Sequence, residues 1–212
     1  MSLDSSQLGF DGLLADAEGA NRAHRFERET GHLPDTMDEA VPFMRLLIRQ
    51  HHAAMLDANV DSTMELRREA RRLALRLNRG EPGIIANDDA PGCILERLCS
   101  APSGAVLLYG QNGVFVIDVD GMAVRVSLEG FFGIGASVYF WPGFSVTAVD
   151  IDRPFLSETG YRSFLGIGAD PVAGLTPDEF ARKVVAAYIE QELRGKPVMI
   201  AERWRKDRSG DG

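Results

Sequence analysis

The amino-acid sequence predicts an α+β fold with an N-terminal helical portion, an antiparallel meander of about five strands, and a C-terminal helix packed on the sheet. Three observations support this prediction. Apolar residues recur at helical spacing up to about residue 80, alternate with polar residues in the middle of the chain, and return to helical spacing after residue 176. No helical segment separates the predicted strands, which argues against a sheet built of βαβ units.

Residues 1–80 form the predicted helical portion. A weak helix is expected over residues 12–29, with Gly31 ending it. A second helix is expected from the capping-box sequence that Thr36 opens to about Ala58.

Pro42 lies one turn into this second helix. It either kinks the helix or moves the start of the regular part to about Val41. A third helix is expected from another capping box, opened by Ser62, to Asn78, with Gly80 beyond it. The short link between the second and third helices predicts an antiparallel hairpin, in which the third helix packs through Leu66, Ala70, Leu73 and Leu77.

Residues 81–92 are the predicted connector to a sheet domain at residues 93–200, because Gly, Pro, Asn and Asp are concentrated there. Strands are expected at residues 105–109, 114–119, 122–128, 137–141 and 144–151. Hairpin turns are expected between them at Gln111-Asn112-Gly113, Asp120-Gly121 and Pro142-Gly143.

The glycine-rich segment 129–136 connects two of the predicted strands. Its order is G-x-x-G-x-G, whereas dinucleotide-binding loops have G-x-G-x-x-G, and a strand rather than a helix is expected after it. We therefore predict a connection in which Phe131 and Phe132 are packed or exposed, and no nucleotide site.

Residues 175–180 carry the strongest helix start signal in the chain, a capping box opened by Thr176 together with the spacing of a hydrophobic staple. This last helix is expected to end at Arg194-Gly195 and to lie across one face of the sheet. A tail follows at residues 201–212, with fraying expected at 202–208 and disorder at 209–212.

Charge falls into three blocks. The chain has 23 Lys and Arg against 31 Asp and Glu, a net charge of −8. Residues 1–39 carry nine acidic and three basic residues (net −6), residues 40–80 four and eight (net +4), and residues 81–212 eighteen and twelve (net −6). This distribution excludes a generally basic nucleic-acid coat, and we expect no strong nucleic-acid binding.

The basic middle block coincides with the third predicted helix, which carries Arg67, Arg68, Arg71, Arg72, Arg76 and Arg79. We predict that its arginines point outward. They form either a solvated face, with counter-charges on the same helix or in residues 1–39, or a surface for an acidic partner or for phosphates. No aromatic residue lies between them, which weakens the single-strand-binding alternative.

The cysteines and histidines match no metal or catalytic pattern. Cys93 and Cys99 are expected to be free thiols. His24, His32, His51 and His52 lack zinc-ligand spacing. Of the adjacent pair His51 and His52, one is expected at a packing seam and the other in solvent. With no P-loop and no G-x-S-x-G sequence, we predict no catalytic residue, no metal and no cofactor.

Membrane association is not expected, because no run of eighteen apolar residues occurs and the acidic N-terminus does not resemble a signal peptide. The predicted location is the cytoplasm.

The densest group of functional side chains lies between Asp150 and Gly166. Two arginines there could hold a carboxylate or phosphate, with hydroxyl groups as further donors. The candidate ligand-binding residues are Arg153, Ser157, Glu158, Thr159, Tyr161 and Arg162. The structural alternative is an ordered loop in which Arg153 pairs with Asp150 while Phe155 and Phe164 enter the core.

The stretch from Trp141-Pro142-Gly143-Phe144 to Arg162-Ser163-Phe164 resembles uncharacterised proteobacterial proteins, some of them on plasmid-like or integrated elements, with no named family. The resemblance carries no residue role and implies an accessory protein of a mobile element. The predicted function is a non-enzymatic cytoplasmic binding or regulatory protein with a protein partner or as a homodimer. The alternative is a small enzyme or small-molecule binder that uses the Arg153–Arg162 loop on an anionic ligand.

Overall fold

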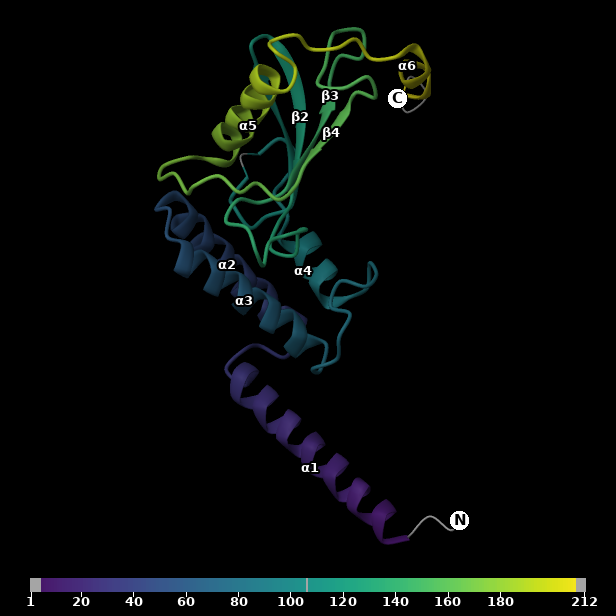
Figure 1. Cartoon of the computed structure of the whole chain (residues 1–212). Coiled ribbons are helices and arrows are strands. Elements are labelled where there is room, and N and C mark those ends of the chain that lie inside the picture. Colours follow the sequence, from purple (N-terminus) through teal and green to yellow (C-terminus); the bar gives the residue numbers. More distant parts are fainter. Residues whose placement is uncertain (1–4, 106, 209–212) are drawn as a thin grey trace.

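The computed structural model describes residues 5–105 and 107–208, and it confirms the predicted α+β fold (Figure 1). The helices are α1 (Ser5–Thr30), α2 (Met37–Leu56), α3 (Val60–Leu77), α4 (Pro91–Cys99), α5 (Pro177–Gln191) and α6 (Glu202–Arg208). The strands are β1 (Gly113–Val119), β2 (Met122–Leu128), β3 (Phe144–Ala148) and β4 (Tyr161–Phe164). They form one antiparallel meander in the order β1-β2-β3-β4, so the sheet has four strands where about five were expected.

α2 and α3 form the predicted hairpin and lie side by side (Figure 1). α2 begins ahead of Pro42, which lies inside the helix. The predicted cap of α3 at Ser62 is wrong: Asn59 caps the helix, and its Oδ1 accepts a hydrogen bond from the Ser62 amide at 3.0 Å. The predicted end of α3 is confirmed, since Asn78 is its C-cap.

The hairpin, α4 and part of the loop after β2 share one apolar core. Leu73 of α3 and Leu95 of α4 are completely buried in it, with Met44 of α2 beside them. Phe131 and Phe132 enter this core from the glycine-rich loop, the name used here for residues 129–143 between β2 and β3. This loop therefore ties the sheet to the helices.

The prediction that all α3 arginines point outward is wrong for Arg67, which is only 6% exposed. Its position follows Thr63 by four residues and precedes Ala70 by three, and both neighbours are buried. Helical spacing thus places Arg67 on the packed side of α3.

The Asp120-Gly121 turn between β1 and β2 is confirmed. Both residues have positive φ, 52° and 81°, as a two-residue turn that matches strand twist requires. The other two predicted hairpin turns, at residues 111–113 and 142–143, do not join strands.

Two predicted strands are absent from the described residues, and one unpredicted strand is present. The described part of 105–109 is irregular because side chains satisfy its backbone: the Leu108 amide donates to Gln111 and the Tyr109 amide to His52. Residues 137–141 are irregular because Arg67 takes carbonyls there that a sheet partner would otherwise use. β4 lies inside the segment that was predicted to be a loop.

α5 covers one face of the sheet (Figure 1). Its predicted capping box is confirmed, with the Thr176 amide donating to Glu179 Oε2 at 3.1 Å. Leu175 and Phe180 are both buried in the second core, where the Phe180 ring stacks on Trp141 at 4.6 Å.

The tail prediction is corrected in part. Residues 202–208, which were expected to fray, form α6, and the predicted disorder at 209–212 lies outside the described residues. Between α5 and α6, Val198 forms an isolated antiparallel β-bridge with Phe155. The domain boundaries predicted at 81–92 and 201 stay a prediction. α4 begins within the last two residues of the predicted connector and packs on α2 and α3.

Candidate interaction surfaces

The predicted site between Asp150 and Gly166 has its two arginines in separate environments. The Arg153 side chain is exposed and pairs with Asp150 at 3.2 Å, as the structural alternative expected. Arg162 lies on β4 with its guanidinium carbon 4.6 Å from the centre of the Tyr188 ring of α5. The two guanidinium groups therefore have different partners.

The hydroxyl groups of this segment bond to its own backbone. Ser157 Oγ donates to the Tyr161 carbonyl at 2.7 Å, and Thr159 Oγ1 contacts the same carbonyl at 3.1 Å. The Glu158 side chain is exposed, while its carbonyl accepts from the Ala201 amide. Phe155 and Phe164 are buried, again as the structural alternative expected.

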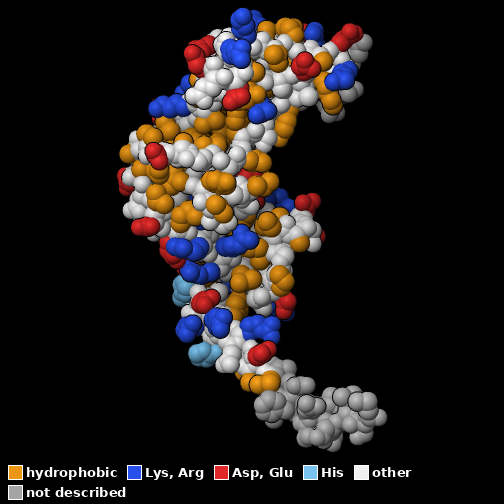
Figure 2. Space-filling model, viewed as in Figure 1, with side chains coloured by type: hydrophobic (Ala, Val, Ile, Leu, Met, Phe, Trp, Pro, Cys, Tyr) orange, Lys and Arg blue, Asp and Glu red, His pale blue; other side chains and the backbone are white. Residues whose placement is uncertain are grey.

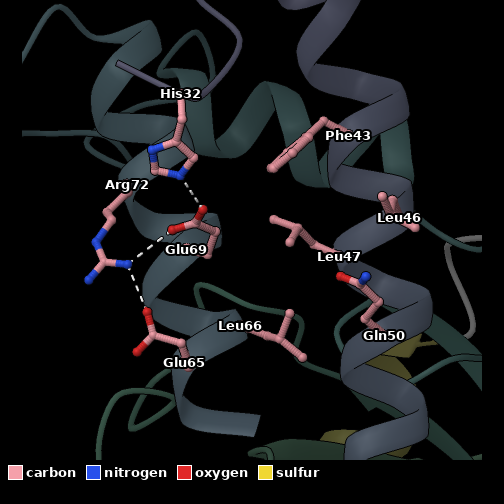
Figure 3. A pocket seen from close by; sticks show the side chains of 9 residues that line it. All are labelled: His32, Phe43, Leu46, Leu47, Gln50, Glu65, Leu66, Glu69 and Arg72. Atoms are coloured by element: carbon pink, nitrogen blue, oxygen red, sulfur yellow. Dashed lines mark hydrogen bonds and ion pairs between the residues drawn. The ribbon is translucent and has the colours of Figure 1, made fainter. Parts of the chain in front are cut away.

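The helical hairpin carries an open groove of about 510 Å³ between α2 and α3, which we call the hairpin groove. Figure 3 shows Phe43 and Leu47 of α2 pointing toward α3 and Leu66 of α3 pointing toward α2, while Leu46 lines the groove from the outer part of α2. Leu46 is 41% exposed, so the groove presents apolar surface to solvent. The sequence did not predict this groove, because Leu66 was expected to lie on the packed face of the third helix.

One edge of the hairpin groove is a chain of ion pairs (Figure 3). His32 Nε2 lies 2.6 Å from Glu69, and Arg72 bonds Glu69 at 3.0 Å and Glu65 at 2.8 Å. The Arg72 hydrogen bond holds the pKa of Glu65 below its usual value. The charged edge is thus satisfied within the molecule and leaves the apolar walls as the open part of the groove.

Arg67 joins the hairpin to the glycine-rich loop. Its guanidinium donates to the carbonyls of Ala136, Tyr139 and Phe140 at 2.9, 2.6 and 2.7 Å, and Nε donates to His51 Nε2 at 2.9 Å. Burial lowers the Arg67 pKa to about 10, which leaves the group charged at neutral pH. The carbonyl dipoles compensate the buried charge in place of a carboxylate.

His51 is the acceptor in this arrangement. Burial, and then the nearby Arg67 charge, lower its pKa from 6.5 to about 3, so the ring is neutral at physiological pH. Its Nε2 lone pair receives the Arg67 proton, which assigns the ring proton to Nδ1. The prediction that one member of the His51–His52 pair lies at a packing seam is confirmed by His51. The prediction that the other lies in solvent is wrong, because His52 is half-buried and accepts a hydrogen bond from the Tyr109 amide.

Three arginines of α3, Arg68, Arg71 and Arg72, form an exposed or half-exposed row that we call the arginine strip. It lines a hollow of about 380 Å³ together with Leu75, Pro82, Gly83 and Ile84. Figure 2 shows basic side chains gathered over the helical part of the molecule, next to a broader apolar area. Basic and apolar surface are therefore neighbours here.

Among residues 5–105 and 107–208, no group of three or more His, Cys, Asp or Glu side chains is placed to hold a metal ion. Within the same ranges, no helix combines the length and the apolar character needed to cross a membrane.

Comparison with known proteins shows similarity to one described family over part of the chain. Residues 112–202, which run from β1 to the start of α6, match the family model described as KlcB third domain. The chain is also 38% identical over 138 residues to Protein KlcB of Escherichia coli, an alignment that covers 64% of this chain and 32% of the relative. No solved structure matches.

A second Protein KlcB of Escherichia coli is 38% identical over 112 residues, covering 53% of this chain and 23% of the relative. The chain thus spans a third or less of the length of these curated relatives. The stretch 141–164 lies inside the matched residues, so the prediction that its resemblance corresponds to no named family is corrected.

Proposed function

We propose that this protein is a non-enzymatic binding or regulatory protein that serves a mobile genetic element and acts in the cytoplasm. The similarity to KlcB, a plasmid-associated protein, supports the link to a mobile element. It covers the whole sheet, α5 and the glycine-rich loop, which Arg67 fastens to the helical hairpin.

The strongly shifted titratable groups support binding rather than catalysis. Such groups often mark catalytic sites, but here each of them completes a structural hydrogen bond. Arg67 holds carbonyls of the glycine-rich loop, His51 accepts from Arg67, and the buried Tyr109 hydroxyl donates to the Leu175 carbonyl at 2.9 Å.

The hairpin groove is the observation that carries the proposal. Its apolar walls are open, its charged edge is already paired, and both walls are helices held by a common core. A groove of this kind suits the apolar face of an amphipathic helix, with side chains at i, i+3 and i+4. We therefore propose a helical segment of a partner protein as its occupant.

Affinity purification from cells that carry the mobile element tests this proposal. The bait is compared with Leu46→Glu, which places a carboxylate on the open apolar wall, and with Leu98→Glu, a matched change at an exposed leucine of α4. A partner should be recovered with the wild-type protein and with Leu98→Glu but not with Leu46→Glu. Equal recovery with all three baits would refute the groove as the binding site.

We keep the Arg153–Arg162 loop as a second proposal, because both arginines are exposed to solvent. Its ligand would be a small carboxylate or phosphate compound. Titration calorimetry with inorganic phosphate should show binding that Arg162→Ala weakens without a change in melting temperature. Absence of binding in the wild-type protein would contradict this second proposal.

A further inference from the structure

The arginine strip is a composite surface. Arg68 and Arg71 line the hollow of about 380 Å³ on one side and a cleft of about 70 Å³ beside Ala136 and Ser137 of the glycine-rich loop on the other. The two depressions therefore meet at these arginines and form one surface along α3, with basic groups in the middle and apolar lining at both ends.

The charges of this strip are only partly satisfied. Arg68 pairs with Glu65 at 2.6 Å, and Arg72 pairs with Glu65 and Glu69. Arg71 is exposed and, among the described residues, has no ion-pair or hydrogen-bond partner. The strip thus keeps an unpaired positive charge beside the apolar side chains of Leu75 and Ile84.

α1 carries the side chains that complement the arginine strip. It extends away from the rest of the molecule, and its contact with the body lies at its C-terminal end, where Arg76 pairs with Glu27 and lies over the Phe26 ring (Figure 1). Leu14 is 48% exposed, and Asp16 and Glu18 are exposed as well.

The sequence of α1 explains why a free helix is unfavourable there. It contains Gly9, Gly12 and Gly19, and glycine is a poor helix former when no tertiary packing supports the helix. Residues 5–18 contain three acidic residues and no basic one. Leu14 and Glu18, four positions apart, share one face of the helix and combine an apolar with an acidic side chain.

We propose that the acidic first half of α1 in one copy of the chain docks on the arginine strip of a second copy, and that the exchange is reciprocal. The charge blocks are complementary, since residues 1–39 carry a net charge of −6 and residues 40–80 of +4. Leu14 would lie against the apolar lining at Leu75 and Ile84, and Glu18 would neutralise Arg71. Reciprocal exchange forms both contacts in one two-fold dimer.

α1 does not dock on the arginine strip of its own chain, because it is a continuous helix that leads away from the body (Figure 1). A nucleic-acid backbone would use the arginines but would leave the apolar lining uncovered. The acidic, apolar helix of a second copy satisfies both parts of the surface.

Analytical ultracentrifugation over a micromolar concentration series tests the proposal. We expect a monomer–dimer equilibrium whose dissociation constant rises by about tenfold or more between about 0.1 and 1 M salt, because screening shortens the Debye length from about 10 to about 3 Å. Arg71→Glu and Glu18→Arg should each abolish the dimer. An equimolar mixture of these two variants should restore it, since both docking contacts then join opposite charges.

Arg49→Glu is the matched control, since it reverses the charge of an exposed arginine on α2. It should leave the dimer unchanged, and circular dichroism should show equal helix content in all variants. A monomer at every concentration, a dimer that survives Arg71→Glu, or a mixture of the two charge variants that stays monomeric would each overturn the proposal.

Discussion

Arg67 shows how one side chain can connect two parts of a fold. A buried arginine is costly unless its donors are satisfied, and here three loop carbonyls and one imidazole satisfy them. The arrangement is therefore mutual: the loop compensates the arginine, and the arginine replaces the hydrogen bonds that a strand partner would give the loop.

Replacing Arg67 by methionine should destabilise the protein by at least about 3 kcal/mol, because buried carbonyls lose their donors and each unsatisfied group costs about 1–3 kcal/mol. Urea denaturation measures the change. Arg49→Met, at an exposed arginine of α2 outside both candidate surfaces, serves as the control and should shift stability by no more than about 0.5 kcal/mol. Equal stability of the two variants would contradict the role assigned to Arg67.

The burial of His51 should lower the free energy of unfolding of the protein in mild acid. Its pKa is about 3 in the folded protein against 6.5 for the free side chain, so the unfolded chain binds one more proton between these values. The contribution is fully present above pH 6.5 and declines by about 1.4 kcal/mol per pH unit as the pH falls below it.

The matched variant is His51→Gln, whose amide oxygen keeps an acceptor for Arg67 but does not titrate. Carboxylates also titrate in this window, so the difference between the two pH profiles isolates His51. The slope of unfolding free energy against pH should be smaller in the variant. Identical slopes between pH 6.5 and 4 would show that His51 is protonated in the folded state.

The packing of the helical hairpin depends on the buried face of α3. Leu73 is completely buried between the helices, whereas Arg72, its neighbour in sequence, reaches solvent. Leu73→Ala should cost about 2–5 kcal/mol, the transfer loss plus the cavity it leaves. The melting temperature of Leu73→Ala is compared with that of Leu98→Ala, a matched change at an exposed leucine of α4. Equal melting temperatures of the two variants would show that the hairpin core tolerates the cavity.

Some elements with local signals could be predicted from the sequence. The Thr176 capping box and the Asp120-Gly121 turn depend on neighbouring residues, so they appear in the structure as expected. The segment 137–141 has the composition of a strand, but distant side chains, above all Arg67, take its backbone carbonyls. The local pattern cannot reveal a partner that lies 72–73 positions away.

The same distinction applies to the candidate surfaces. The segment with Arg153 and Arg162 could be found because its residues are neighbours in the sequence, yet the bond to Asp150 and the contact with Tyr188 depend on the fold. The hairpin groove could not be found, because only packing decides which apolar residues are covered. The burial of Arg67 could have been predicted, because its helical spacing from Thr63 and Ala70 places it on the packed side of α3.

For the whole molecule, the thiols should be irrelevant to stability. Cys93 and Cys99 are both free, and the Cys99 thiol lies in the helical core. Burial also raises the Cys99 pKa, which disfavours the reactive thiolate. Dithiothreitol should therefore leave the melting temperature unchanged; a melt that depends on reductant would point to a disulfide in solution.

The net charge of −8 predicts weak binding to duplex DNA. The arginine strip attracts phosphate locally, but the acidic blocks on both sides oppose it over longer distances. Fluorescence anisotropy at physiological salt should show no submicromolar binding. Submicromolar affinity that weakens steeply with salt would mean that the strip outweighs the net charge.

The claim that unites these features is that the helical hairpin, held to the sheet through Arg67, presents the hairpin groove to a helix of a partner protein. Titration calorimetry of the purified partner against wild-type protein and Leu46→Glu tests it most directly. Leu46→Glu should bind the partner about tenfold or more weakly than the wild-type protein, because a carboxylate would be buried against an apolar face. Unchanged affinity, with Leu46→Glu folded and as stable as the wild-type protein, would contradict it.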